Sequence, residues 1–307
     1  MKPRLFSNSL RLGFGCSGAW GMGWFSERKA ARLVRQALDL GVTHFDTGSF
    51  YCGGEAERRL GRALEGVSAD DVFVSTKCGT RLDRFGSPYK NFSESALRAD
   101  VETSLKRLRR ERLDLLYLHG PDQREIDDAH AVLDRMRQEG MIAAVGVCGE
   151  GKALDYAVDQ GAVDVIMGVY NVFYREHATV FSRAARKGVG VAAVAPLAQA
   201  VYRKGFFLPR SLPDLWSLTR ALVRRRDDLA RARGVGARRL ENVDGWTPVQ
   251  AALGFTLANP NIDVTFTTTT RAHHLADSVA TARRSLPDQV IAELNAIAPL
   301  DRKGCGA

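Results

Sequence analysis

The stretch HFDTGSFYCGGEAERRLG, residues 44–61, decides the fold class of this chain. A short apolar run ends in Asp46, a glycine-rich turn carries Tyr51, and a helical pattern follows the turn. Apolar runs and helical patterns keep alternating along the rest of the sequence, which is typical of strand–helix units around a parallel sheet. Eight such runs can be read, and eight strands close a sheet into a barrel. The sequence therefore predicts an α/β fold, a (β/α)8 TIM barrel, as a single domain over residues 1–307.

The expected elements follow from the periodicity of the apolar residues. Strands are expected at Leu10–Gly15, Thr43–Asp46, Val72–Lys77, Leu113–Leu118, Ala143–Val147, Val163–Val169, Val189–Ala195 and Val264–Thr267. Helices are expected at Ser26–Leu40 with Ser26 as N-cap, at Ala96–Leu108 and at Thr247–Leu257, and Pro287–Ile297 is expected to be an extra C-terminal helix. The segment between the seventh strand and Thr247 is much longer than a barrel helix needs. We therefore expect an elaborated loop after strand 7, on the face where barrel enzymes build their sites.

Four polar residues follow predicted strands and are candidates for catalysis. Asp46 and Tyr51 follow the second strand, Lys77 ends the third in DVFVSTKCG (71–79), and His119 follows the fourth in LDLLYLHGPD (113–122). Parallel strands end at the same edge, so these side chains should lie together. Tyrosine titrates near about 10, and an adjacent ammonium favours the phenolate, so we expect Tyr51 to pass a proton near neutral pH. This arrangement indicates carbonyl reduction.

These segments resemble the aldo-keto reductase family, whose catalytic tetrad has the order and spacing of Asp46, Tyr51, Lys77 and His119. The similarity runs from LRLGFGCSG near the start to TTTTRAHHLADS near the end, and the chain is similar to a divergent member of the bacterial sugar and aldose dehydrogenase-like branch. The resemblance implies an NAD(P)(H)-dependent oxidoreductase. It would reduce an aldehyde or ketone, or oxidise the corresponding alcohol or sugar, with Tyr51 as the proton donor.

The resemblance also implies a dinucleotide lying across the barrel mouth, with its phosphates at the last strand–helix loop. Consecutive threonines, a helix N-terminus and Arg271 can form an anion site there. Contact of Arg271 or His274 with a ribose phosphate would select NADPH, and NADH is the alternative; the threonine run could instead reflect β-propensity. The implied cofactor-binding residues are Gly15, Asp46, Cys148, Asn171, Ala195, Pro196, Leu197, Thr267, Thr268, Thr269, Arg271, His274 and Asp277.

Three residues depart from the family pattern around the nicotinamide. Cys148 stands where a serine is common, Met167 where a glutamine is usual, and Val194 where an aromatic ring often stacks. These departures leave two other hypotheses open. One is a cofactor-independent lyase, epimerase or isomerase on the same scaffold, and the other is a non-catalytic nucleotide-binding regulatory protein.

Aromatic residues in the loops are candidates for the substrate pocket. Trp20 and Trp24 lie in the glycine-rich first loop, Phe50 precedes the catalytic tyrosine, and Phe173 follows the sixth strand. We expect them to form an aromatic wall at the barrel mouth. Packing of the two tryptophans in the core is an equally open alternative.

The charge balance does not indicate a nucleic-acid partner. The net charge is +9, but much of the excess lies in Arg220–Arg239, where no aromatic residues interleave as a single-strand platform would need. That stretch is typical of a solvated amphipathic helix. The expected partner is a small-molecule carbonyl or alcohol, and the sequence does not indicate an oligomeric state.

Cysteine usage and hydropathy bear on the compartment. The five cysteines are widely spaced and include no C-x-x-C pair, so we expect neither disulfides nor a metal site. No apolar run reaches the roughly 18 residues of a membrane span, and the N-terminus lacks the apolar stretch of a signal peptide. The sequence therefore predicts a cytoplasmic protein that is not associated with a membrane.

Overall fold

The computed structural model describes most of the chain. It covers Phe6, residues 10–197, Leu215, Leu218, Thr219, Leu222, and residues 239–241 and 243–299. The loop expected after the seventh strand, and with it the arginine-rich stretch, lies almost entirely outside the described residues. Within the described part, no helix is both long enough and apolar enough to cross a membrane.

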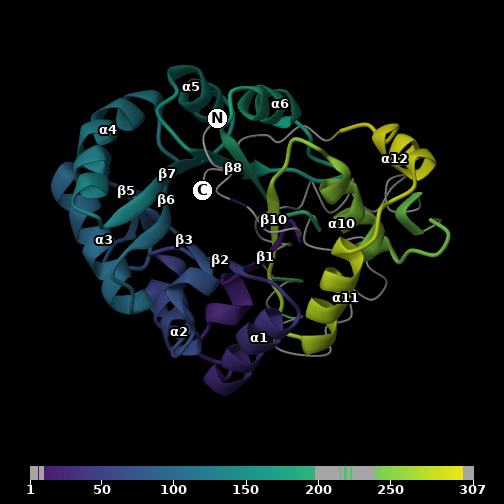
Figure 1. Ribbon diagram of the computed structural model, residues 1–307, viewed down its shortest axis with the longest axis horizontal. Coiled ribbons are helices and arrows are strands. Elements are labelled where there is room, and N and C mark those ends of the chain that lie inside the picture. The colour runs from purple at the N-terminus through teal and green to yellow at the C-terminus, as the bar shows by residue number, and fades with distance from the viewer. Residues whose placement is uncertain are drawn as a thin grey trace.

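Eight parallel strands form a closed barrel, as the sequence predicts, and helices surround it (Figure 1). The strands are β1 (Leu12–Gly15), β2 (His44–Asp46), β3 (Phe73–Cys78), β6 (Leu113–His119), β7 (Ile142–Cys148), β8 (Val165–Val169), β9 (Gly190–Val194) and β10 (Val264–Thr267). Each lies within two residues of its expected ends. Neighbours in the chain are neighbours in the barrel, and β10 closes it against β1.

Nine described helices accompany these strands. They are α1 (Glu27–Asp39), α2 (Glu55–Ala63), α3 (Glu94–Leu108), α4 (Gln123–Gln138), α5 (Lys152–Gln160), α6 (Ala178–Arg186), α10 (Pro248–Ala258), α11 (Ala272–Ala282) and α12 (Asp288–Asn295). Asp122 and Thr247 begin α4 and α10 with capping boxes, whereas Ser26 precedes α1 without a side-chain cap bond. The extra C-terminal helix that the sequence predicts is α12.

Two hydrophobic cores result from the alternation of side chains along each strand. One core fills the space between barrel and helices. The other fills the barrel itself, where Leu115, Tyr117 and Met167 pack together, and Phe6 packs against it at the start of the strands, next to Phe73. Because residues two apart share a face, Phe73, Ser75 and Lys77 of β3 point into the barrel. This alternation brings the lysine to the inner rim of the barrel at the carboxyl end of its strand.

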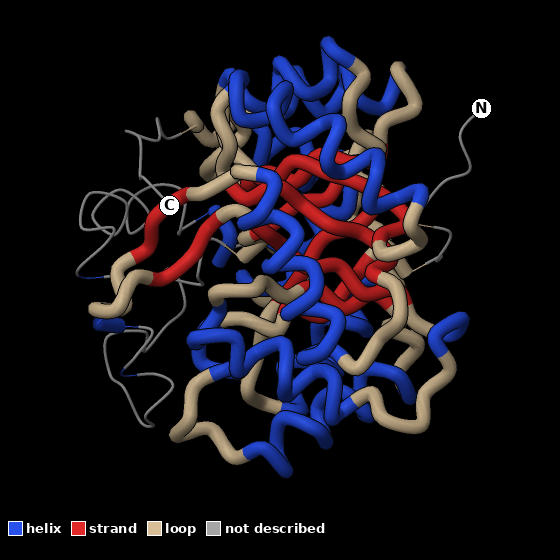
Figure 2. Tube along the Cα trace, turned by 90° about the vertical axis from the view of Figure 1, so that its left-hand side faces the viewer, coloured by secondary structure: helices blue, strands red, loops and turns tan. Residues whose placement is uncertain are grey.

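The structure contains a hairpin after β3 that the sequence did not predict. Strands β4 (Thr80–Leu82) and β5 (Pro88–Lys90) pair antiparallel outside the barrel (Figure 2). The base of this hairpin is bonded to the end of β6: Thr80 Oγ1 donates to the His119 carbonyl at 3.0 Å, and Lys90 donates to the Gly120 carbonyl. The hairpin is short and its residues are mostly exposed, so it has no alternating apolar pattern by which the sequence could reveal it.

Candidate active site

The centre of the site is a buried ion pair between adjacent strands. Lys77 Nζ donates to Asp46 Oδ2 at 2.6 Å and to the Thr47 carbonyl at 2.6 Å, and Ser75 Oγ donates to Asp46 Oδ1 at 2.7 Å. The side chain of Lys77 is 2% exposed. Burial alone would lower the pKa of Lys77, but attraction to Asp46 and then Tyr51 leaves this pKa above its ordinary value. Lys77 therefore stays an ammonium held by Asp46.

Tyr51 lies beside this ammonium, in the 3-10 turn η2 (Tyr51–Gly54). Lys77 Nζ is 5.1 Å from the centroid of the phenol ring. Burial raises the pKa of Tyr51 to about 12, although Lys77 acts in the lowering direction. The expectation of a tyrosine pKa shifted toward neutral is therefore wrong for this arrangement, because desolvation outweighs the ammonium. A phenol in this state keeps its proton, as a donor must until the transition state forms.

His119 completes the group from the end of β6. Its ring lies 6.4 Å from that of Tyr51, nearly perpendicular at 87°, and stacks on Phe50 at 5.2 Å. Burial, followed by repulsion from Lys77 and Lys90, lowers the pKa of His119 to about 3, so the imidazole is neutral. Its Nδ1 is buried and has no hydrogen-bond partner among the described residues. A neutral imidazole can donate one N–H to a substrate oxygen. The four residues singled out in the sequence thus lie together at one end of the barrel.

Ser75 and Lys90 also lie at this site, next to Asp46 and His119, although the sequence did not indicate them as site residues. Ser75 is two residues before Lys77 on β3, so strand alternation alone could have indicated that it faces Asp46. Lys90 could not be found in this way. It reaches the end of β6 only because the β4–β5 hairpin folds back.

Cys148 ends β7 next to the tetrad. Strand register pairs it with His119 on one side and with the buried Met167 on the other. Burial raises the pKa of the Cys148 thiol to about 12, with Lys77 acting in the opposite direction. This part of the mouth therefore has a protonated thiol, a weak hydrogen-bonding group, next to a thioether that packs in the barrel core.

Asn171 joins the ends of two strands on the opposite side of the mouth. Its Nδ2 donates to the Ala195 carbonyl at 2.9 Å, and its Oδ1 accepts from the backbone N–H groups of Phe173 and Tyr174 at 2.9 and 3.0 Å. Ala195, which precedes the buried Pro196 and the half-buried Leu197, has a φ of 55°, an unusual value for a residue with a side chain. Asn171 is 1% exposed and stabilises this backbone from within.

The last strand–helix loop has the features of an anion site. A Cβ at Gly15 would lie 2.5 Å from Thr268 Oγ1, so only glycine permits this close approach of β1 to the loop. Thr268 Oγ1 lies 3.4 Å from Ser17 Oγ, and Thr269 Oγ1 accepts from the Arg271 N–H at 3.1 Å. The side chain of Arg271, the N-cap residue of α11, makes no cap hydrogen bond within the described residues. A helix N-terminus beside hydroxyls and an arginine fits a phosphate group.

Other residues predicted for this anion site have different placements. Thr267 is buried in β10. His274 lies in the first turn of α11 with its ring against His273. Asp277 Oδ1 accepts from Gln250 Nε2 of α10 at 2.6 Å, so the structure assigns its carboxylate to helix packing rather than to the start of the helix. The cofactor contact expected for Asp277 stays a prediction.

The predicted aromatic wall is divided between core and mouth. Trp20 is fully buried, with its ring edge-on to Phe14 at 6.1 Å, and Phe173 is also in the core. Trp20 thus has the core packing that the sequence left open as the alternative, whereas the burial of Phe173 differs from the expected place in the wall. Phe50 stacks on His119, and Trp24 is 39% exposed. Burial of Trp20 follows from the turn η1 (Gly18–Gly21), which folds the first loop inward.

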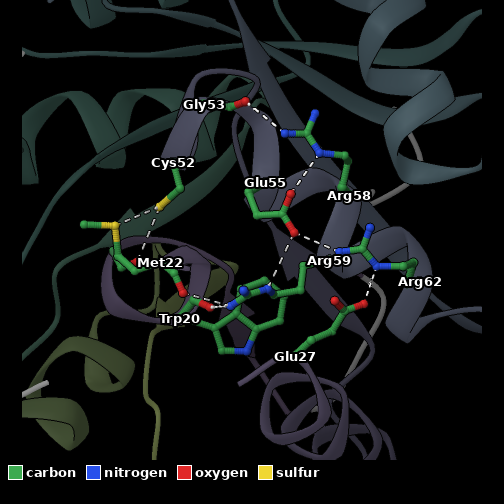
Figure 3. Close-up of polar contacts among 10 residues, drawn as sticks. Trp20, Met22, Glu27, Cys52, Gly53, Glu55, Arg58, Arg59 and Arg62 are labelled. Atoms are coloured by element: carbon green, nitrogen blue, oxygen red, sulfur yellow. Dashed lines mark hydrogen bonds and ion pairs between the residues drawn. The ribbon is translucent and has the colours of Figure 1, made fainter. Parts of the chain in front are cut away.

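The first loop is anchored to α2, as Figure 3 shows. The buried Arg59 donates through Nη1 to the carbonyls of Trp20 at 2.7 Å and Met22 at 3.3 Å. Cys52 Sγ lies 3.7 Å from Met22 Sδ and 3.6 Å from the Gly18 carbonyl. These contacts join the loop that carries Trp24 to the turn that carries Tyr51.

Comparison with known proteins places this geometry in a family. The model of the aldo/keto reductase family matches residues 11–299. D-threo-aldose 1-dehydrogenase of a Pseudomonas species is 32% identical over 225 residues, which cover 62% of this chain and 68% of that protein. L-galactose dehydrogenase of Arabidopsis thaliana is 32% identical over 205 residues, which cover 62% of each chain. The holo form of an aldo-keto reductase from Bacillus halodurans superimposes with a TM-score of 0.79 at 22% identity, covering 98% of both chains, which shows the shared fold. The chain therefore belongs to the aldo/keto reductase family and is an oxidoreductase.

Proposed function

We propose that this protein interconverts a carbonyl compound and its alcohol with a nicotinamide dinucleotide, and that Tyr51 is the residue that donates the proton. The observation that carries the proposal is the arrangement of Tyr51 between a buried ammonium and a neutral imidazole. Lys77 Nζ lies 5.1 Å from the phenol ring, and the His119 ring lies 6.4 Å from it. Family membership favours this chemistry over a hydride-free lyase and over a regulatory protein without activity.

Each residue of the group has a distinct role in this proposal. The nicotinamide supplies a hydride when bound. His119 donates an N–H to the substrate oxygen and orients the carbonyl. Tyr51 transfers its proton to that oxygen as negative charge develops there, and the Lys77 ammonium stabilises the phenolate that remains. Asp46 holds the ammonium in place through the 2.6 Å contact.

The cofactor preference that we propose is NADPH over NADH. Support comes from the cationic Arg271 and from His274 at the start of α11, where a ribose phosphate would meet positive charge and a helix dipole. Residues that would hold the nicotinamide end are Cys148, Asn171 and Ala195. The buried amide of Asn171 bonds to backbone groups, so the phosphates would supply most of the affinity.

A sugar or a related polyhydroxylated aldehyde is the proposed substrate class. Two relatives that are 32% identical are named as dehydrogenases of aldoses or galactose. The described mouth offers one stacking surface, Phe50 on His119, and one partly exposed indole, Trp24. Aromatic faces of this kind pack against the C–H faces of a sugar ring while its hydroxyls remain hydrated.

The test is the variant Tyr51→Phe. It keeps the ring packing and removes the proton, so turnover should fall by about 10²–10⁴-fold. Affinity for NADPH, followed by quenching of tryptophan fluorescence, should stay within about twofold of the wild type, because the phenol lies beside Lys77 and His119 rather than at the proposed anion site. Wild-type turnover by the variant would overturn the proposal. Equal affinity for NADPH and NADH in the same titration would remove its cofactor preference alone.

A further inference from the structure

The turn that carries Tyr51 is fixed at the peptide of Ser49, two residues earlier. The Ser49 N–H donates to the backbone carbonyl of Lys77 at 3.3 Å. Its carbonyl accepts from Nη1 of Arg107, a residue of α3, at 2.9 Å. The Ser49 peptide is thus held between the strand of the catalytic lysine and a guanidinium from a distant helix.

The same guanidinium contacts the turn on the other side of Tyr51. A Cβ at Gly54 would lie 2.2 Å from Arg107 Cζ, so the side chain of Arg107 occupies the space above this glycine. Gly54 also has a φ of 84°, which glycine adopts without strain. Arg107 therefore touches the chain just before and just after the catalytic tyrosine.

A buried carboxylate neutralises Arg107. Glu57 of α2 is 0% exposed, and its Oε2 accepts from Arg107 Nη1 at 3.1 Å. Its Oε1 accepts from Thr76 Oγ1 at 2.7 Å. Thr76 precedes Lys77 on β3 and faces outward while the lysine faces into the barrel. Both oxygens of Glu57 are therefore satisfied, as a buried charge requires.

These contacts form one continuous path around the proton donor. It begins at Thr76, beside the catalytic lysine, and passes through Glu57 and Arg107 to Ser49. The helices that contribute to it, α2 and α3, lie side by side on one side of the barrel (Figure 1). The N–H of Ser49 is bonded to the Lys77 carbonyl, and the carbonyl of Ser49 is bonded to Arg107. A shift of Arg107 would therefore move the Tyr51 turn relative to Lys77.

We propose that Arg107 and Glu57 are positioning residues that set the distance between the Tyr51 hydroxyl and the reacting oxygen. Neither side chain is part of the Asp46–Lys77–Tyr51–His119 group, and both act through the turn of residues 49–54. The proposal rests on the proposed role of Tyr51 as proton donor. A displacement of about 1 Å at a reacting group can cost roughly a hundredfold in rate, so the effect should be large.

Helix α3 offers a matched control. Arg98, on the same helix, pairs with Glu139 through two contacts of 2.7 and 2.8 Å. Both of these side chains are substantially exposed, at 33% and 45%, and neither contacts the turn of residues 49–54 in the described structure. Exposed ion pairs contribute little to stability. Arg98→Met therefore makes the same substitution as Arg107→Met in the same helix, but without a contact to the turn.

The experiment compares Arg107→Met, Arg107→Lys, Glu57→Gln and the control Arg98→Met, each with and without Tyr51→Phe. We expect Arg107→Met to lower kcat about 10- to 100-fold and to leave KM and the affinity for NADPH within about twofold. Arg107→Lys should recover part of kcat, because it retains the charge. Arg98→Met should behave as the wild type. The solvent deuterium isotope effect on kcat should rise in Arg107→Met, because proton transfer becomes slower than the other steps.

The double variants separate positioning from general support of the fold. If Arg107 acts through Tyr51, Arg107→Met should cause no further loss of kcat in the Tyr51→Phe background, because residues that act as a unit are not additive. A full additional loss in that background would overturn the proposal, as would a folded Arg107→Met with wild-type kcat. If Arg107→Met does not fold, the same comparison in Glu57→Gln and Arg107→Lys decides. Failure of the proposed function would differ, because Tyr51→Phe alone would then keep its turnover.

Discussion

The two sides of the barrel mouth are held by different kinds of contact. On the β2–β3–β6 side, charged and aromatic side chains meet one another directly, and Lys77 Nζ lies 2.6 Å from Asp46 Oδ2 in a buried setting. On the β7–β8–β9 side, the corresponding groups are uncharged: the Cys148 thiol, the buried Met167 thioether and the Asn171 amide. The amide of Asn171 bonds to backbone groups. In the proposed function, the first side moves a proton and the second shapes and holds a ligand. Removing a contact on the first side should therefore lower turnover and the free energy of unfolding far more than removing one on the second side.

The largest effect is expected for Lys77→Met. Methionine leaves the Asp46 carboxylate buried without its partner, so the free energy of unfolding should fall by about 3–5 kcal/mol. Turnover should fall by about 10³-fold, because the phenolate of Tyr51 loses its stabilising charge. Chemical denaturation and steady-state kinetics measure the two effects. Adding Asp46→Asn should restore part of the stability and none of the activity, and recovery of activity in that double variant would contradict the assigned roles.

A smaller effect is expected for Asn171→Ala. The variant leaves the N–H groups of Phe173 and Tyr174 without their acceptor, which should lower the free energy of unfolding by about 1–3 kcal/mol. It also releases the Ala195 backbone, so affinity for NADPH should fall severalfold while turnover at saturation stays close to wild type. Asn91→Ala is the control, because Asn91 Oδ1 also accepts a backbone N–H, that of Ser93, but lies outside the β7–β8–β9 side of the mouth. A loss of turnover as large as in Lys77→Met would show that the two sides are not distinct.

The smallest effect is expected for Cys148→Ser. A hydroxyl is a better hydrogen-bond donor and acceptor than a thiol, and a gain of about 0.5–1.5 kcal/mol would tighten nucleotide binding by roughly two- to tenfold. Fluorescence titration with NADPH measures the change. Cys52→Ser serves as the control, because Cys52 lies by the first loop, where it contacts Met22. Weaker binding in Cys148→Ser than in this control would mean that the thiol is a better ligand contact than the hydroxyl.

Local sequence patterns predicted the barrel and its tetrad for a definite reason. Apolar runs separated by helical periods specify βα units, and closure brings every strand end to one rim, so Asp46, Lys77 and His119 had to meet. The same logic predicted the extra helix α12. It failed for the β4–β5 hairpin, whose exposed residues follow no apolar period, and for Trp20, whose burial depends on how the first loop folds over α2.

The pKa values of the site residues and the contacts between distant helices could not be predicted from the sequence. It indicated an ammonium next to a phenol, but the sign of the shift in the Tyr51 pKa depends on how deeply the phenol is buried, and burial is a tertiary property. Likewise, nothing local connects Glu57 and Arg107, which are fifty residues apart in the chain. The sequence by itself determined which groups stand at the barrel rim, because strand and helix periods are local. Only the tertiary structure decided how those groups are charged and held, because desolvation and contacts between helices arise when the chain closes on itself.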